Sequence, residues 1–402
     1  MRFILVAALL LAANPAHAGV VARTEKICQL TGEVDRERGA DTLNRTETRF
    51  GLRGTDTGAP VVSPDAARGR ARDIVMLFGD TVPIRGDDAD RPPDGDAIAV
   101  VPGGQDPARC LHLAFVAGAD GRYLAPRVPG VALGAYEIPV AGVALDDLWI
   151  FAITDRSDNR AHGRTVLTRA RRAAPIRDLD LVYELSAGKF INVWPAFAAD
   201  AGAGSDLLLF GSGAYRRSNL FLAAIDPARL GDRAAWRYFA GTDEAGAPRW
   251  SADEAAAAPL IRDPDFTPCI GEQSVTWIPP LRRWLMLYNC DTPRGIVLRL
   301  AERPWGPWSA PTVLFDPWRD GYCRFIHASW DAQRCDQVFD AIHGHERAHD
   351  WGGEYGPYVL APFTSGADGV ATIYWTLSTW NPYQVMLMRS TIVLDQGDAA
   401  IR

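Results

Sequence analysis

One pattern of apolar and polar residues occurs five times along this chain. Each copy is an apolar run that ends in small or polar residues. The copies read IVMLFGDT, LWIFAITD, LLLFGSGAY, WLMLYNCD and TIYWTLST, at residues 74–81, 148–155, 207–215, 284–291 and 372–379. A second strand-like run follows each of them, at residues 96–101, 164–170, 218–226, 295–302 and 383–390. Paired apolar runs of this length are typical of β-hairpins, and a hairpin repeated at this spacing is typical of propeller blades.

The repeat predicts an all-β protein, a five-bladed β-propeller. We expect residues 19–402 to form one propeller domain, with an insertion around residues 331–353. Length alone would favour two or three domains, but five similar units around one axis account for the whole chain.

The first 18 residues resemble a secretory signal peptide. Arg2 supplies the positive start, residues 3–13 the apolar stretch, and Ala16-His17-Ala18 the small-residue cleavage pattern. No apolar stretch is long enough for a membrane span. We therefore expect export to the periplasm or the extracellular medium.

The charge and cysteine content agree with an exported globular protein. The formal net charge is −7, and no basic face is evident, which argues against nucleic acid as a partner. Six cysteines allow three disulfides. Proximity suggests Cys269 with Cys290 and Cys323 with Cys335, which leaves Cys28 with Cys110; the sequence alone leaves other connectivities open.

Blade geometry is expected to bring residues from all five copies to one face. Strands run antiparallel outward from the axis, so the entry to the first strand and the turn after the second share a face. If the repeated runs are second strands, the residues that end them point there: Asp80, Asp155, Ser212, Asn289 and Ser378. The residues just before each first strand join them: Asp56, Glu137, Trp194, Glu272 and Tyr355. We therefore predict a rim of carboxylates and aromatic side chains.

Such a rim suits cleavage of a glycosidic bond. One carboxyl group donates a proton to the leaving oxygen, and another attacks the anomeric carbon or activates water. Asp56 stands in GTDTG and Asp80 in FGDT, where glycines let the backbone turn sharply. Together with Glu272, in IGEQS, they are the predicted catalytic residues. The alternative is that each Asp caps a turn and that Glu272 pairs with Arg294.

Further polar and aromatic residues are predicted to bind substrate. Aromatic faces stack on sugar rings, and charged or amide groups bind hydroxyls. The predicted set is Glu137, Trp194, Asn289, Arg294, Tyr355, Trp380, Asn381 and Tyr383. The last three cluster in STWNPYQ, which could equally be a packed corner around Pro382.

The order of these motifs resembles a known family. GTDTG, FGDT, IGEQSVTW, YGPY and STWNPYQV, within residues 44–390, look like a secreted bacterial family filed as a domain of unknown function. That family is similar to five-bladed propeller glycosidases and includes endo-D-arabinanases. The resemblance implies a secreted hydrolase of furanosidic, arabinan-type polysaccharide, with Asp56 and Asp80 as its carboxylate pair. We expect no cofactor and name no metal-binding residue, and the sequence does not show whether an ion helps to shape the site.

Two other functions remain open. The sequence HERAH at residues 345–349 fits H-E-x-x-H, whose two histidines can hold zinc on a helix, so a zinc-dependent hydrolase is one alternative. The segment is flanked by Gly344 and Gly352, which leaves room only for a short helix. The other alternative is a non-catalytic carbohydrate-binding propeller, since a fold does not determine a function. In each case we expect a monomer, because a closed propeller needs no partner to cover its edges.

Overall fold

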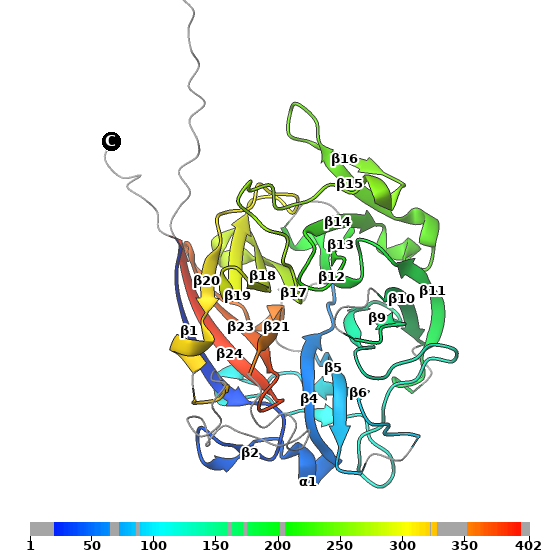
Figure 1. The fold of residues 1–402 in the computed structure, drawn as a ribbon, viewed down its shortest axis with the longest axis vertical. Coiled ribbons are helices and arrows are strands. Elements are labelled where there is room, and N and C mark those ends of the chain that lie inside the picture. Colours follow the sequence, from blue (N-terminus) through cyan, green and yellow to red (C-terminus); the bar gives the residue numbers. More distant parts are fainter. Residues whose placement is uncertain are drawn as a thin grey trace, which may run out of the picture.

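The computed structural model describes residues 20–64, 72–85, 89–158, 163–171, 175–201, 206–321, 323–327 and 352–394. Nearly all regular structure in these ranges is β-strand, arranged as five sheets around a common axis (Figure 1). The predicted five-bladed β-propeller is confirmed. In the described part of the chain no helix has the length and apolar character needed to cross a membrane.

The five innermost strands form a closed ring, in which each contacts its neighbours in chain order. They are β4 (Leu52–Pro60), β8 (Pro139–Ala144), β12 (Asn192–Phe197), β17 (Gln273–Ile278) and β21 (Glu354–Val359). The second strands are β5 (Ile74–Pro83), β9 (Leu148–Thr154), β13 (Leu207–Ser212), β18 (Arg283–Asp291) and β23 (Val370–Thr379). These are the five repeated apolar runs, as predicted. Each lies between two strands of its sheet.

The third strands match the second runs of the sequence pattern. They are β6 (Gly95–Val101), β10 (Arg164–Ala170), β14 (Leu220–Ile225), β19 (Arg294–Ala301) and β24 (Val385–Leu394). Outer strands complete the blades: β7 (Ala114–Phe115), β11 (Asp180–Ser186), β15 (Arg237–Thr242) with β16 (Pro248–Ser251), and β20 (Thr312–Phe315). β22 (Ser365–Ala367) pairs with β23 in the fifth blade.

The remaining elements are short and lie between strands. They are β2 (Val34–Asp35), β3 (Ala40–Asp41), α1 (Thr46–Phe50), a π-turn at Pro317–Gly321, and 3-10 turns at Pro107–Arg109, Ala198–Ala201, Pro227–Arg229, Arg233–Ala235, Glu254–Ala256, Pro279–Leu281 and Ala361–Phe363.

The second strands are apolar without alternation because both of their faces are covered. β13, LLLFGS, is buried at every position, and its side chains join a core that spans adjacent blades. Strands buried on both faces carry continuous apolar runs, whereas half-exposed strands alternate. The sheet faces packed between blades therefore produce the pattern from which the fold was predicted.

The fifth blade is completed by the beginning of the described chain. β1 (Val20–Gln29) pairs antiparallel with β24 and forms the outer strand of that sheet (Figure 1). The Thr24 hydroxyl lies 2.8 Å from the Ser390 hydroxyl and also donates to the Leu314 carbonyl at 2.9 Å, in the fourth blade. The amino-terminal strand thus links the last blade to its neighbour, a contact that the sequence did not predict.

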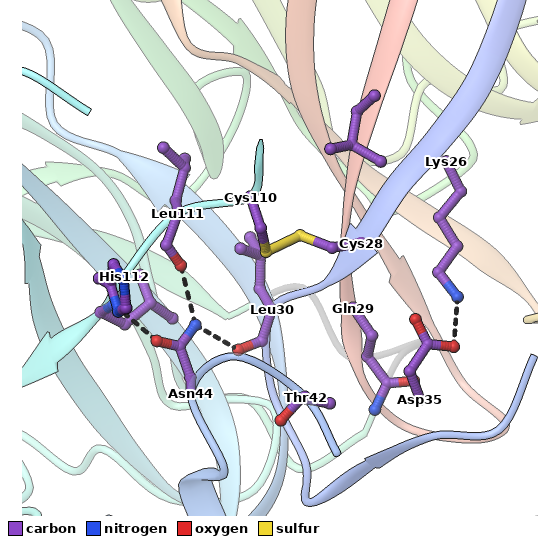
Figure 2. Close-up of a disulfide and its surroundings, with 12 residues drawn as sticks. Lys26, Cys28, Gln29, Leu30, Asp35, Thr42, Asn44, Cys110, Leu111 and His112 are labelled. Atoms are coloured by element: carbon purple, nitrogen blue, oxygen red, sulfur yellow. Dashed lines mark hydrogen bonds and ion pairs between the residues drawn. A yellow bond between two sulfur atoms is a disulfide. The ribbon is translucent and has the colours of Figure 1, made fainter. Parts of the chain in front are cut away.

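A disulfide fastens this strand to the first blade. Figure 2 shows the bond between Cys28, on β1, and Cys110, which precedes β7. Beside it the Asn44 amide donates to the Leu30 and Leu111 carbonyls, both at 2.9 Å. The disulfide and these hydrogen bonds therefore hold the first and fifth blades together where the ring closes.

Two of the three predicted disulfides are present. Cys269–Cys290 is bonded, as proximity suggested, and so is Cys28–Cys110, the pair that was left by subtraction. The predicted partner of Cys323, Cys335, lies outside the described residues, as do the signal peptide and most of the predicted insertion.

Candidate active site

A cavity of about 260 Å³ opens at one end of the propeller axis, and all five blades contribute to it. Its lining residues are Asp56, Thr57, Asp80, Tyr136, Ile138, Arg156, Tyr215, Arg216, Glu272, Arg294, Gly353, Tyr355 and Trp380. The structure thus brings together the three predicted catalytic carboxylates, which are up to 216 residues apart in sequence. Of the predicted binding residues, Arg294, Tyr355 and Trp380 also line it.

Asp56 is held on β4 by tyrosine hydroxyls from the fifth blade. Tyr355 donates to Asp56 Oδ2 at 3.0 Å, and Tyr383 lies 3.5 Å from the same oxygen. Burial raises the pKa of Tyr355 well above its usual range, and the charge of Asp56 adds to this effect, so the phenol stays protonated and donates. The Tyr355 hydroxyl therefore stabilises a negative charge on Asp56.

Close backbone packing lets Asp56 approach β5. A Cβ at Gly79, its partner in the sheet register, would lie 2.9 Å from Asp56 Oδ1 and 2.7 Å from Ile138. Any larger residue at position 79 would therefore displace the carboxylate. The glycine of the FGDT motif is explained by this contact.

Asp80 has a different environment from Asp56. It is half-buried at the end of the repeated run, and its Oδ1 accepts a hydrogen bond from the Tyr136 N–H at 2.9 Å. Burial raises the pKa of Asp80 well above its ordinary value, and the neighbouring charge of Asp56 raises it further, while the Tyr136 bond acts in the opposite direction. Asp80 therefore holds its proton at a pH at which an exposed aspartate has lost it.

Tyr383 connects the two carboxylate residues. Its hydroxyl donates to the Asp80 carbonyl at 2.9 Å, close to Asp56 Oδ2. The ring is 2% exposed and packs edge-to-face against Trp380 at 5.9 Å. Tyr383 is thus a positioning residue beneath the cavity rather than part of its wall.

Glu272 faces the cavity from the fourth blade, directly before β17. The Tyr215 hydroxyl donates to its Oε2 at 3.0 Å. Two guanidinium groups lie over the Tyr215 ring, those of Arg156 and Arg216, each 5.2 Å from its centroid. Burial raises the pKa of Tyr215, so its phenol remains a donor at neutral pH. On this side of the cavity two arginine side chains therefore stack on the ring of one tyrosine.

Arg294 forms the neighbouring wall. Its guanidinium lies 3.9 Å from the Glu354 carboxylate and 4.5 Å from the centroid of the Trp318 ring. Burial lowers the pKa of Arg294 and raises that of Glu354. The sequence suggested Glu272 as a partner for Arg294, whereas the structure pairs it with Glu354.

The backbone of the cavity wall is strained. Thr57, Asp80, Tyr136 and Arg216 have φ angles of 60°, 42°, 65° and 52°. This left-handed region is costly for residues other than glycine, most of all for a β-branched threonine. Such conformations gather at functional sites, where the surrounding structure holds them in place.

Besides Tyr383, four predicted binding residues do not line this cavity. Trp194 is 1% exposed and stacks on Tyr358 at 5.3 Å. Glu137 accepts from the Gly134 N–H at 3.2 Å within its own loop. Asn289 and Asn381 are 1% and 2% exposed. We therefore leave these residues out of the proposed binding set.

The error for Trp194 has a simple cause. The prediction placed Trp194, Asp56 and Tyr355 just before their first strands, but β12, β4 and β21 begin earlier and contain them. Trp194 is consequently an inward residue of β12, where it packs between blades. Asp56 and Tyr355 also lie within their strands, but both line the cavity.

Sequence reasoning missed Tyr136, Arg156, Tyr215 and Arg216 as site residues. Tyr215 ends the third repeated run, so its position at the rim could have been inferred from the same rule as Asp80. The two arginines lie in loops without periodicity. In a chain rich in arginine, no local signal distinguishes them.

A third aspartate lies behind the pair. Asp96, on β6, is 1% exposed. Burial raises its pKa well above the ordinary value, and the charges of Asp80 and Asp56 add to this effect. A carboxyl group in this position is neutral over a wider pH range than a solvated one.

Asp96→Asn is expected to flatten the pH dependence of stability. Native Asp96 keeps its proton above pH of about 3.9, where unfolded aspartates lose theirs. The free energy of unfolding of the wild type therefore falls as pH rises from there through the raised pKa, by up to about 1.4 kcal/mol per pH unit for this group. Urea unfolding at several pH values tests this. An unchanged slope in the variant would contradict it, and Asp155→Asn, at an exposed site, is the control.

Tyr355→Phe is expected to lower turnover without unfolding the protein. The change removes the hydroxyl that donates to Asp56 Oδ2 and keeps the buried ring. A lost hydrogen bond to a charged group costs about 1.5–3 kcal/mol, which corresponds to about 10- to 100-fold in rate. The measurement is kcat on a substrate that the wild type hydrolyses, and a thermal melt of the variant is the control. Wild-type turnover in the variant would show that this bond does not position Asp56.

The HERAH segment, residues 345–349, lies outside the described residues. The zinc alternative therefore stays a prediction. Gly352 and Gly353, which follow it, enter the fifth blade beside Trp380, because the Gly352 carbonyl accepts the Asn381 N–H at 3.0 Å.

The fold and the cavity together define the class: a five-bladed β-propeller whose axial cavity carries a pair of unlike aspartates. Within that class the chain belongs to the family described as a domain of unknown function, DUF4185, which matches residues 151–389. The predicted family resemblance is confirmed. Asp56 and Asp80 precede the matched range, whereas Glu272, Arg294 and Tyr355 lie within it.

Several solved structures resemble the chain at low identity. One is Zg3597, a family 117 glycoside hydrolase from the marine bacterium Zobellia galactanivorans, at 11% identity over 93% of this chain and 91% of that one, with a TM-score of 0.44. Another is the GH43 endo-arabinanase of Bacillus licheniformis, at 11% identity over 84% and 95%, with a TM-score of 0.37. A third is Bacillus subtilis levansucrase, at 9% identity over 86% and 88%, with a TM-score of 0.43. No curated protein sequence matches the chain.

Proposed function

We propose that this protein is an exported glycoside hydrolase that cleaves furanosidic, arabinan-type polysaccharide. The observation that carries the proposal is the pair of unlike aspartates in one cavity. Asp80 is desolvated and retains its proton, whereas Asp56 accepts the Tyr355 hydroxyl, which stabilises a negative charge. Two carboxyl groups whose environments separate their protonation states are what acid and base roles require.

The roles follow from this difference. Asp80 donates its proton to the glycosidic oxygen as the bond from that oxygen to the anomeric carbon breaks. Asp56 either attacks the anomeric carbon or removes a proton from the attacking water. Over the full cycle one water is consumed, and one new reducing end and one alcohol are formed. Arg294 and Trp380 provide polar and aromatic contacts for the sugar.

The test is a polysaccharide panel with product analysis. D-arabinan, L-arabinan, galactan and synthetic furanosides are incubated with the wild type and with the double variant Asp56→Asn/Asp80→Asn. New oligosaccharides from an arabinan with the wild type alone support the proposal. Binding without any product, equal in both proteins, would indicate a carbohydrate-binding propeller instead. Cleavage that a chelator stops would indicate the zinc hydrolase.

Glu272→Gln is expected to have a smaller effect than changes to the pair. Glu272 accepts from Tyr215 and faces the substrate side of the cavity, so we assign it to a supporting catalytic role that binds a sugar hydroxyl. Loss of one such bond corresponds to about 10-fold to 100-fold in kcat/KM. Steady-state kinetics measure it. A loss as large as that of Asp80→Asn would transfer the acid role to Glu272.

A further inference from the structure

A second cavity, of about 460 Å³, lies away from the axial one and shares no lining residue with it. It lies between the third and fourth blades, where the β15–β16 hairpin extends outward (Figure 1). Its other wall is the segment between β19 and β20. Its volume is within the range of small-ligand sites, roughly 300–1,000 Å³.

Three guanidinium groups line this cavity, those of Arg262, Arg299 and Arg303. Arg299 is 2% exposed, and its guanidinium is fixed by the Tyr288 hydroxyl at 3.0 Å and the Ser309 carbonyl at 2.7 Å. Arg262 and Arg303 are exposed at the rim.

None of these three charges has a carboxylate partner in the part of the chain that the structure describes. Within the described residues no ion pair involves Arg262, Arg299 or Arg303. A buried guanidinium is normally paired, because an uncompensated buried charge is costly. Asp263, the one acidic residue in the lining, leaves an excess of positive charge. The cavity is therefore suited to an anion.

Two tryptophans supply the rest of the wall. Trp305 and Trp308 line the cavity, and their indole N–H groups are buried without an acceptor among the described residues. The indole rings add flat apolar surface beside the guanidinium groups.

We propose that this cavity binds an acidic saccharide unit of a polysaccharide, one that carries a carboxylate or sulfate group. The anionic group pairs with the guanidinium groups, whose forked donors match such oxygens. The sugar ring lies against the indoles, and Asp263 accepts from a ring hydroxyl. The anionic character follows from the cavity alone, whereas the choice of a saccharide rests on the proposed function.

Binding is measured in the double variant Asp56→Asn/Asp80→Asn, so that turnover at the axial cavity does not interfere. The probes are oligogalacturonate, a sulfated galactan oligosaccharide, a neutral arabino-oligosaccharide and ATP, each titrated by calorimetry. We expect one of the two acidic saccharides to bind and to weaken with added salt. Arg262→Gln/Arg303→Gln is expected to weaken it at least about tenfold, since each charge-assisted bond contributes this much.

Arg109→Gln, an exposed arginine of the first blade, is the matched control and is expected to bind as the parent does. Hydrolysis of a small furanoside by Arg262→Gln/Arg303→Gln in an otherwise wild-type chain is expected to stay unchanged. Equal binding of the neutral and acidic saccharides, preference for ATP, no binding of either acid, or unaltered affinity in the arginine variant would each overturn the proposal. Absence of hydrolysis by the wild type would instead count against the proposed function.

Discussion

Asp80→Asn is expected to reduce polysaccharide cleavage by about 10³-fold, because a positioned general acid contributes about 10²- to 10⁴-fold. An amide in this position cannot donate the proton that the leaving sugar needs. Asp56→Asn is expected to be at least as damaging, because it removes the attacking or proton-accepting oxygen. Both changes preserve shape, so thermal melts are expected to remain close to the wild type.

The leaving group separates the two roles. An aryl furanoside releases a stable phenolate and needs little protonation, so Asp80→Asn is expected to retain far more activity on it than on polysaccharide. Asp56→Asn is expected to lose activity on both the aryl furanoside and the polysaccharide. Asp155→Asn is the matched control, since Asp155 ends the next repeated run but pairs with Arg164 outside the cavity. If Asp155→Asn were equally inactive, or if the aryl substrate rescued Asp56→Asn instead, the assignment would be wrong.

The pH profile offers a second measurement of the same pair. Donation requires protonated Asp80, so activity is expected to fall as pH rises through its pKa. Because burial raises the pKa of Asp80, that limb is expected to lie well above the ordinary aspartate value of about 3.9. In Asp80→Asn the alkaline limb should disappear for aryl substrates.

The second large effect concerns stability. Removal of the Cys28–Cys110 bond by substitution of both cysteines with alanine is expected to lower the free energy of unfolding by about 2–5 kcal/mol. The bond joins residues 82 apart, so it strongly restricts the unfolded chain. It also holds β1 against the first blade. Guanidinium unfolding of the oxidised wild type and the variant gives the difference.

The second disulfide is an internal comparison. Cys269–Cys290 spans only 21 residues, and the chain-entropy relation makes its contribution about 1 kcal/mol smaller. It adjoins Gly271, whose added Cβ would meet the Asn289 side chain at 2.3 Å, close to Glu272. Loss of Cys269–Cys290 is therefore expected to lower activity more than stability. Loss of Cys28–Cys110 is expected to lower stability more than activity. Equal stability losses would show that ring closure does not depend on the longer bridge.

The second and third strands could be predicted because their signal is local. The run at residues 148–155 contains β9, whose sequence LWIFAIT is apolar because both faces of the strand are largely covered. First strands were less well predicted. β4 reads LRGTDTGAP, a mixture of glycine and polar residues that gives no clear period, so its start was misplaced.

The pattern of apolar and polar residues could not predict long-range contacts. β1 reads VVARTEKICQ, which resembles any outer strand, and its partner lies at the opposite end of the chain. Asp80 could be proposed because it ends a repeated apolar run, and Asp56 because it was placed just before a first strand; both have glycine neighbours. Arg156 and Arg216 could not, because only the folded ring shows which loop cations share the stack around Tyr215.

The join between β1 and β24 has a consequence for how the protein matures. Thr24 and Ser390, which meet across it, are 366 residues apart in the chain. A polypeptide that emerges from synthesis or from a translocation channel in order cannot make this contact until almost all of it has appeared. Contacts of such long range delay folding, so closure of the ring is expected to be a late step that waits until the residues around Ser390 are available.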